Sequence, residues 1–165
     1  MQATRVREKS HRLPRSCYIG ETTVSLTLCI EQRVPVFSDP GLVAQFVDIL
    51  GATATRWSCI VPVYCFMPDH LHLVVHGDNP TSDIWKMAAG YKQRTGYWWS
   101  SHRHGTYWEK GFHDHVLRGE EDLAAHVRYV LENPYRKGLV EDGMDYPYSG
   151  AVGCSLEDVL SGLPL

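Results

Sequence analysis

The stretch Trp57–His76, WSCIVPVYCFMPDHLHLVVH, carries the strongest fold signal in the sequence. Its two ends, Trp57–Phe66 and His70–His76, are dominated by apolar and β-branched residues, which fit the pleated surface of a strand. Between them, Met67-Pro68-Asp69 has the composition of a turn, because proline presets its own φ and aspartate tolerates turn geometry. The stretch therefore predicts two antiparallel strands joined as a hairpin.

Outside the hairpin, strands and helices alternate along the chain. The expected strands are rich in apolar and β-branched residues, and apolar residues recur at helical spacing in the expected helices. The expected elements are a strand at Val24–Ile30, a helix at Gly41–Leu50 behind the capping candidates Ser38 and Asp39, a helix at Thr81–Trp99, a polar loop at Ser100–Thr106, a strand at Phe112–Leu117, a helix at Glu120–Glu132 stopped by Asn133-Pro134, and after Leu139 only turns and a short terminal helix. This order favours an α+β domain of ferredoxin-like type, an antiparallel sheet with helices packed on one face.

The composition is that of one globular domain. Of the 165 residues, 44% are hydrophobic and 21% charged, so the chain can bury a core and is not disordered. It has no continuous apolar run of the roughly 18 residues that a membrane helix needs. The basic N-terminus also has no apolar segment behind it, so neither a membrane span nor a signal peptide is expected. Five cysteines without a CxxC pair favour reduced thiols and a cytoplasmic location.

The net charge of −3 hides an uneven distribution. Residues 1–18 carry five Lys or Arg against one Glu, and residues 141–165 carry five acids and no Lys or Arg. Residues 85–118 are also locally basic. Charge alone is typical of an ordinary solvated surface, but a local potential can select a charged partner despite the negative total. The chain is divided accordingly into a basic arm (1–18), a central domain (19–140) and an acidic tail (141–165).

The pair His70-Leu71-His72 is the first candidate for chemistry. Successive side chains of a strand point to opposite faces, so both histidines share one face while Leu71 lies on the other. Two imidazoles placed in this way can be neighbouring ligands of one divalent cation. The alternative is that they are two exposed strand histidines without a ligand.

The helix expected before Pro134 presents a second polar group. At about 100° per residue, Tyr129 and Asn133 lie together on a flank beside its apolar face, and His126 lies on the same flank. A phenol and an amide oxygen are therefore displayed side by side. The alternative is a tyrosine at the rim of the core, with Asn133 as a helix C-cap.

Three ordered segments resemble a known family. They are Tyr64–Val75 (YCFMPDHLHLVV), Trp108–Arg118 (WEKGFHDHVLR) and Tyr129–Val140 (YVLENPYRKGLV), followed by Tyr146–Gly150 (YPYSG). The first resembles the HUH signature of single-tyrosine transposases, in which U is a hydrophobic residue. Together they resemble the REP-associated tyrosine transposases, the domesticated branch of that superfamily, over about residues 12–150. Asp69 stands where many members have Asn, and Tyr135 where Val or Leu is common; neither position is expected to bind metal.

The resemblance implies a fold of the HUH endonuclease type over residues 19–140 and a metal-dependent enzyme that cleaves and rejoins single-stranded DNA at or near hairpins. In such an enzyme Tyr129 would be the nucleophile and would form a 5′-phosphotyrosine intermediate. His70, His72 and Asn133 would hold Mg²⁺ or Mn²⁺. His115 would be an auxiliary base or a structural histidine, of which the structural role is favoured. Expected DNA contacts are Arg5, Arg12 and Arg15 of the arm and Lys86, Lys92 and Arg94 of the basic middle.

Two other functions compete with this interpretation. A non-catalytic nucleic-acid-binding module would keep the fold without forming a covalent adduct. A metal-dependent hydrolase would use water as the nucleophile and would need carboxylate ligands, for which Asp69 and Asp114 are the nearby candidates. If Tyr129 is not the nucleophile, Tyr91 and Tyr97 are the next tyrosines to consider. A monomer is expected rather than a dimer.

Overall fold

A five-stranded antiparallel sheet carries the structure, a computed structural model that describes residues 12–102, 105–118 and 122–165. The strands are β1 (Thr23–Cys29), β2 (Cys59–Met67), β3 (His70–Gly77), β4 (His113–Leu117) and β5 (Ser149–Val152). The α-helices are α1 (Pro40–Arg56), α2 (Ile84–Ser101), α3 (Leu123–Leu131), α4 (Asn133–Arg136) and α5 (Leu156–Leu160), and short 3₁₀ turns lie at Arg15–Tyr18, Glu31–Arg33 and Gly143–Asp145. None of the helices in the described residues is long and apolar enough to cross a membrane.

The predicted hairpin is present and forms the centre of the sheet. β2 and β3 pair from Met67 and His70 outward, with Pro68 and Asp69 as the two turn residues. The strand order is β4-β1-β3-β2-β5. Its first four strands have the order of a ferredoxin-like sheet, in which β1 inserts between β3 and β4. The α+β class and the ferredoxin-like arrangement predicted from sequence are therefore confirmed.

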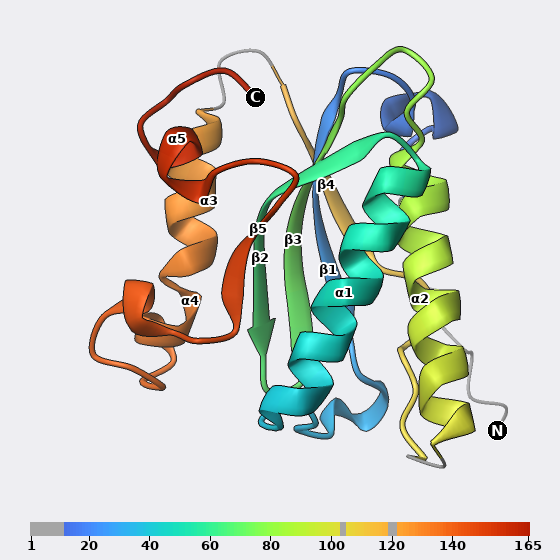
Figure 1. The fold of residues 1–165 in the computed structure, drawn as a ribbon, viewed down its shortest axis with the longest axis vertical. Coiled ribbons are helices and arrows are strands. Elements are labelled where there is room, and N and C mark those ends of the chain that lie inside the picture. Colours follow the sequence, from blue (N-terminus) through green and yellow to red (C-terminus); the bar gives the residue numbers. More distant parts are fainter. Residues whose placement is uncertain (1–11, 103–104, 119–121) are drawn as a thin grey trace, which may run out of the picture.

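Helices cover both faces of the sheet, whereas the sequence predicted helices on one face only. Figure 1 shows α1 and α2 side by side on one face, and α3 and α5 on the other. The reason is the apolar run in β2, where Val61 and Phe66 face the first layer of helices while Val63 and Cys65 face the second. A strand that is apolar on both sides requires a cover on both sides.

The C-terminal segment was the second difference. The sequence predicted only turns and a short helix after Leu139, and the structure adds β5, which pairs with the outer edge of β2. Four residues with a central glycine give almost no strand pattern. Gly150 fits closely there, because a Cβ would lie 2.7 Å from the Tyr64 hydroxyl oxygen and the Tyr64 side chain would have to shift. The short terminal helix is confirmed as α5, and Val159 buries its side chain in the core beneath α3.

The helices agree in place but differ in length. α1 continues past the predicted end at Leu50 to Arg56, and Asp39 caps it by accepting hydrogen bonds from the amides of Gly41 and Leu42. α3 ends at Leu131, as the Asn133-Pro134 pair predicted, but Pro134 then occupies the first turn of α4. Proline is compatible with that position because its missing N–H would be unpaired there in any case.

The buried hydroxyl of Tyr146 fastens the C-terminal segment to β2, because Tyr146 Oη donates a 2.6 Å hydrogen bond to the Phe66 carbonyl. Replacing Tyr146 by Phe should lower the free energy of unfolding by about 1–2 kcal/mol, since a buried acceptor loses its partner. Urea unfolding followed by circular dichroism measures the change. The matched control is Tyr148→Phe, whose hydroxyl makes only a 3.4 Å exposed contact with the Ser38 carbonyl and should change stability by less than about 0.5 kcal/mol. Equal losses in both variants would contradict this role of Tyr146.

Candidate functional site

The sheet face beneath α3 has an apolar half and a polar half. On the apolar half, Val63, Cys65 and Val74 pack against α3 and α5. The other half, here called the polar sheet face, is made by alternate residues of β1, β3 and β4: Thr23, Ser25, Thr27, His72, His76, His113 and His115. His113 and His115 are exposed, so this half is open to solvent.

His70 and His72 meet beside the polar sheet face, as the sequence predicted. Their Nε2 atoms lie 3.0 Å apart. The outer nitrogen of each ring is held from behind: Nδ1 of His70 donates to Oδ1 of Asp69 at 2.5 Å, and Nδ1 of His72 lies 3.1 Å from Oγ1 of Thr27. These contacts orient both rings, and the two Nε2 atoms lie against each other.

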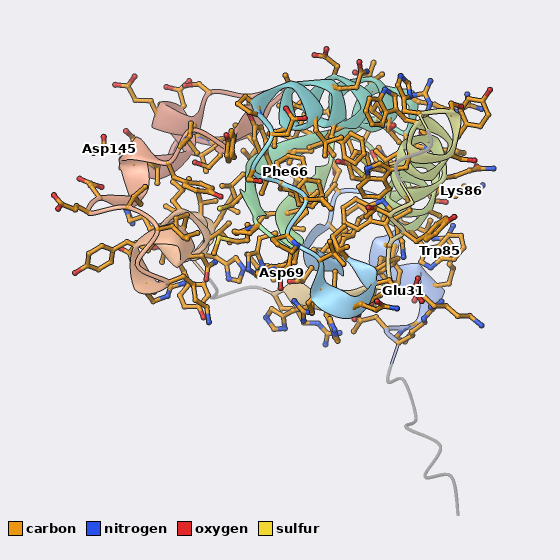
Figure 2. All side chains as sticks on the ribbon, turned by 90° about the horizontal axis from the view of Figure 1, so that it is seen from below. Glu31, Phe66, Asp69, Trp85, Lys86 and Asp145 are labelled. Carbon is orange, nitrogen blue, oxygen red and sulfur yellow. The ribbon has the colours of Figure 1, made fainter. Side chains whose placement is uncertain are left out.

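The turn that carries Asp69 is anchored to the core. Its two carbonyl oxygens accept hydrogen bonds from loop amides, that of Asp69 from Ile30 and that of Pro68 from Phe37. The Phe37 ring is buried among aromatic side chains of α1, α2 and β2. Figure 2, which looks toward this end of the molecule, shows Asp69 between the C-terminal helices and α2. The position of the histidine pair is therefore set by the aromatic core.

The environment of His72 keeps its imidazole neutral. Burial lowers the pKa of His72 to about 4, and the positive charges of His70, Arg136 and His126 add to this effect. Above that pH the ring is neutral and has a lone pair to give to a ligand. The lowered pKa contributes stability that is fully present above about pH 6.5, the unfolded value, and is lost as the pH falls toward 4.

Tyr129 and Asn133 lie together where α3 passes into α4, as predicted, and Arg136 joins them. The guanidinium carbon of Arg136 is 4.0 Å from the centre of the Tyr129 ring. Its Nη2 donates at 2.8 Å both to Oδ1 of Asn133 and to the Tyr129 carbonyl. The Tyr129 ring is 59% exposed, so its hydroxyl is accessible from solvent.

Arg136 is the site residue that sequence reasoning missed. The signal was its spacing, three residues after Asn133 and seven after Tyr129, which places all three on one side of a nearly continuous helix. Its positive charge also reaches His72, as the pKa effect shows. Arg136 therefore links the tyrosine side of the site to the histidine side.

The remaining histidines extend the site across the polar sheet face. Nε2 of His126 is 3.1 Å from Oγ of Ser25, so α3 reaches β1. The His126 ring lies 6.3 Å from the Tyr129 ring and 6.5 Å from the ring of His115, measured between ring centres. His126 shares the flank of Tyr129, as predicted. His115 lies on the same face, one ring farther away, and its role as base or structural residue stays a prediction.

The donor atoms at this site suit a divalent cation. Two Nε2 atoms 3.0 Å apart have the spacing of neighbouring corners of an octahedron with bonds of about 2.1 Å. In the described parts of the chain, no three His, Cys, Asp or Glu side chains are grouped to hold a metal ion. The sequence-based candidate for a third ligand is Oδ1 of Asn133, which accepts a hydrogen bond from Arg136 and has a second lone pair. The Thr27 hydroxyl can accept a hydrogen bond from Nδ1 of His72. In that arrangement the ring proton is on Nδ1, and Nε2 has the lone pair that a metal needs.

The carboxylates needed by a water-using hydrolase are engaged elsewhere. Asp69 binds Nδ1 of His70 and therefore stands behind the pair. Asp114 pairs with Leu26, which places it on the opposite face of the sheet, where it accepts a hydrogen bond from the buried Tyr18 hydroxyl. Neither supplies the further ligand that this function requires.

Two alternative nucleophiles are also placed away from the site. Tyr91 is completely buried in α2, so its hydroxyl cannot reach a substrate. Tyr97 is exposed, but α2 lies on the sheet face opposite α3. Among these tyrosines, Tyr129 is the one that is both exposed and next to the histidine pair.

The predicted DNA contacts fall into separate groups. Arg15 makes a bidentate ion pair with Asp83, at 2.9 and 2.6 Å, and its guanidinium lies over the Trp85 ring. Nζ of Lys86 is 3.8 Å from the same carboxylate and lies over the Trp57 ring. These two cations share one aromatic surface at the start of α2.

The other predicted contacts do not join that surface. Nζ of Lys92 is half-buried and donates to the carbonyls of Glu109 and Gly111, which fastens that loop to α2. Arg94 faces α1, with Nη1 3.4 Å from Oγ1 of Thr53. The Arg12 guanidinium lies 6.0 Å from the Phe112 ring. Arg5 lies outside the described residues.

Comparison with known proteins agrees with the resemblance seen in the sequence. A family model described as transposase, IS200-like, matches residues 19–133. The chain is 31% identical over 121 residues to a Haemophilus influenzae protein assigned as a REP-associated tyrosine transposase, which covers 64% of this chain and 66% of that one. It is 29% identical over 94 residues to the REP-associated tyrosine transposase of Escherichia coli, covering 54% and 52%. The chain thus spans about two thirds and about half of the length of these curated relatives.

A solved structure adds support for the fold. A REP-associated tyrosine transposase bound to a REP hairpin matches 93% of this chain and 88% of its own, with a TM-score of 0.70 and 20% sequence identity. The matched family region, 19–133, contains the histidine pair as well as Tyr129 and Asn133. Because this region is well over half of the chain, the protein belongs to the IS200-like transposase family.

Proposed function

We propose that this protein is a metal-dependent endonuclease and strand transferase that cleaves single-stranded DNA at or near hairpins. The observation that carries the proposal is that one exposed tyrosine, Tyr129, stands with Asn133 and Arg136 on the same side of the sheet as the His70–His72 pair and its open polar face. Family membership supports a DNA-processing activity. The solved relative of the same fold was bound to a REP hairpin, which motivates the choice of a hairpin substrate.

In the proposed reaction, Oη of Tyr129 attacks a DNA phosphorus atom. The new bond joins that oxygen to phosphorus, and the bond to the 3′-oxygen of the preceding nucleotide breaks. The products are a 5′-phosphotyrosine and a free 3′-hydroxyl, once the leaving oxygen has taken up a proton. A phosphodiester is replaced by a phosphodiester, so the reverse reaction can rejoin strands without ATP.

Arg136 assists the nucleophile in this proposal. A phenol has a pKa of about 10 and is a weak nucleophile at neutral pH, so the site has to favour its ionised form. The Arg136 guanidinium carbon, 4.0 Å from the ring centre, holds the Tyr129 ring through a cation–π contact. The same group donates to the Tyr129 carbonyl and so ties the backbone of Tyr129 to α4.

His70, His72 and Asn133 would hold Mg²⁺ or Mn²⁺. A cation bound there would stabilise negative charge on the phosphate oxygens and orient the phosphate. Asp69 and Thr27 keep the imidazoles in position for it. Because the histidine pair and Tyr129 come from one chain, we propose that a monomer suffices for cleavage.

Changing Tyr129 to Phe should abolish strand cleavage and the covalent protein–DNA adduct while leaving DNA affinity nearly unchanged, because only the attacking oxygen is removed. Labelled hairpin oligonucleotides from the DNA around the protein's own gene, run on denaturing gels, measure both products. Tyr135→Phe is the matched control, since that ring is also exposed and lies six residues further along. Cleavage without an adduct would indicate a hydrolase, and binding without cleavage by the unaltered protein would indicate a non-catalytic DNA-binding module.

Changing His70 or His72 to Ala should remove metal-dependent cleavage, and Asn133→Ala should reduce it only in part, because water can replace an amide oxygen more easily than an imidazole. The measurement is the rate of cleavage during titration with Mg²⁺ or Mn²⁺. His76→Ala is the control on the same strand and face, since its ring is bound to Thr23 at the far end of β3. Unchanged cleavage in the presence of a chelator would disprove the metal requirement.

A further inference from the structure

A pocket of about 400 Å³ opens directly beside the histidine pair. Its lining combines apolar side chains with cationic side chains from distant parts of the sequence. The lining residues are Arg33, Pro35, Met67, Pro68, Asp69, His70, Lys137 and Leu139. His70 therefore belongs both to this pocket and to the proposed cleavage site.

We propose that this pocket binds the nucleotide next to the scissile phosphate, with its phosphate between Arg33 and Lys137 and its base against Leu139 and Pro35. The proposal rests on the proposed function, because it assigns a place to one part of that substrate. A pocket with apolar walls and a few convergent polar groups is the usual form of a site for a small group. A nucleotide unit combines an aromatic base with an anionic phosphate, which matches both kinds of wall.

Arg33 has donors available for such a phosphate. Its Nη1 is 3.7 Å from Oδ2 of Asp69 and its Nε is 3.7 Å from Oε1 of Glu109. Both distances exceed the range of a direct hydrogen bond. The two carboxylates therefore attract the guanidinium but do not hydrogen-bond to these N–H groups. Since its side chain is half-exposed, a bidentate contact with a phosphate can form without breaking a buried bond.

An uncommon backbone directs Arg33 toward the pocket. Gln32 and Arg33 both have positive φ values, 57° and 55°, although neither is glycine. The turn is held on its N-terminal side, where the Glu31 amide donates to the Tyr107 carbonyl and the Arg33 amide donates to the Ile30 carbonyl. Non-glycine residues keep this conformation only where the surrounding structure imposes it.

Lys137 supplies the second positive charge. It follows Arg136 at the end of α4, and within the described residues its ammonium group has no carboxylate partner. Arg136, in contrast, is engaged by Tyr129, Asn133 and Glu132. Arg136 therefore holds the nucleophilic tyrosine, whereas Lys137 is available to bind a DNA phosphate in this proposal.

The sharpest test couples a change in the protein to a change in the DNA. The probe is a fluorescein-labelled oligonucleotide with a hairpin from the DNA around the protein's gene and single-stranded flanks. Uncharged methylphosphonate linkages are placed at one phosphate at a time. Binding is measured by anisotropy in a Tyr129→Phe background, so that the strand remains intact. Cleavage of the same unmodified oligonucleotide by the unaltered protein maps the scissile position.

Lys137→Met should weaken binding of the unmodified oligonucleotide about 3- to 10-fold and lower the slope of log affinity against log salt by about one unit. When the phosphate adjacent to the scissile one is replaced by an uncharged methylphosphonate, Lys137→Met should not weaken binding of that oligonucleotide any more. Lys86→Met is the control, because that lysine lies on α2 beside Asp83 and should not couple to this phosphate. An equal effect of Lys137→Met on every modified oligonucleotide, or coupling to a phosphate farther along the strand, overturns the proposal.

Leu139→Ala tests the base half of the pocket. Leu139 is partly exposed, so the variant should fold, and it should weaken binding about 2- to 5-fold. This loss should disappear when the coupled nucleotide is abasic. A loss that persists on the abasic oligonucleotide overturns the placement of the base.

The two proposals fail in different ways. If the unaltered protein forms no covalent adduct while Lys137 still couples to a single phosphate, the proposed reaction is wrong and the pocket is a binding site for a nucleotide. If the adduct forms but neither Lys137 nor Leu139 shows coupling, the reaction stands and the pocket assignment is wrong.

Discussion

The structure depends on the alternation of side chains along β3. Leu71, Leu73 and Val75 are completely buried beneath α1 and α2, while His70, His72 and His76 emerge on the other face. Because β3 lies between β1 and β2, both neighbours hold its register. A shift by one residue would bury the histidines and expose the leucines, so the hydrophobic effect fixes where the imidazoles point. The position of the histidine pair is therefore determined by the packing of the opposite face.

The second constraint is the incomplete cover provided by α3. The helix packs on the apolar side chains of β2 and β3 and leaves the β4 side of the polar sheet face, with His113 and His115, open to solvent. Tyr129 of α3 is mostly exposed, and the Arg136 guanidinium supports its ring. Buried residues of α3, such as Val130, thus hold the helix in place while the adjacent Tyr129 stays accessible to a substrate. Arg136 is bonded to Asn133, and its positive charge contributes to the lowered pKa of His72.

The parts of the fold that were predicted correctly are those with strong local patterns. The hairpin, the two long helices and the break at Asn133-Pro134 each carry a periodic or turn signal of their own. β5 was missed because its pairing depends on the edge of β2 rather than on its own four residues. The second layer of helices was missed for a related reason, since a continuous apolar strand does not reveal on which side its cover will come. The contact of Lys92 with DNA, expected on charge alone, stays a prediction; the structure adds that its ammonium group donates to two backbone carbonyls.

Local patterns in the sequence were enough to identify the candidate chemistry: the histidines share a face because strands alternate, and Tyr129 and Asn133 share a flank because helices repeat every 3.6 residues. Those relations are local and follow from backbone geometry. The three-dimensional packing was needed to show that Asp69 and Thr27 contact the imidazoles, that Arg136 contacts both Tyr129 and Asn133, and that Arg33 and Lys137 line one pocket. Several of these arrangements join residues far apart in the chain, and their distances are set by how the helices and the sheet pack, which no local pattern encodes.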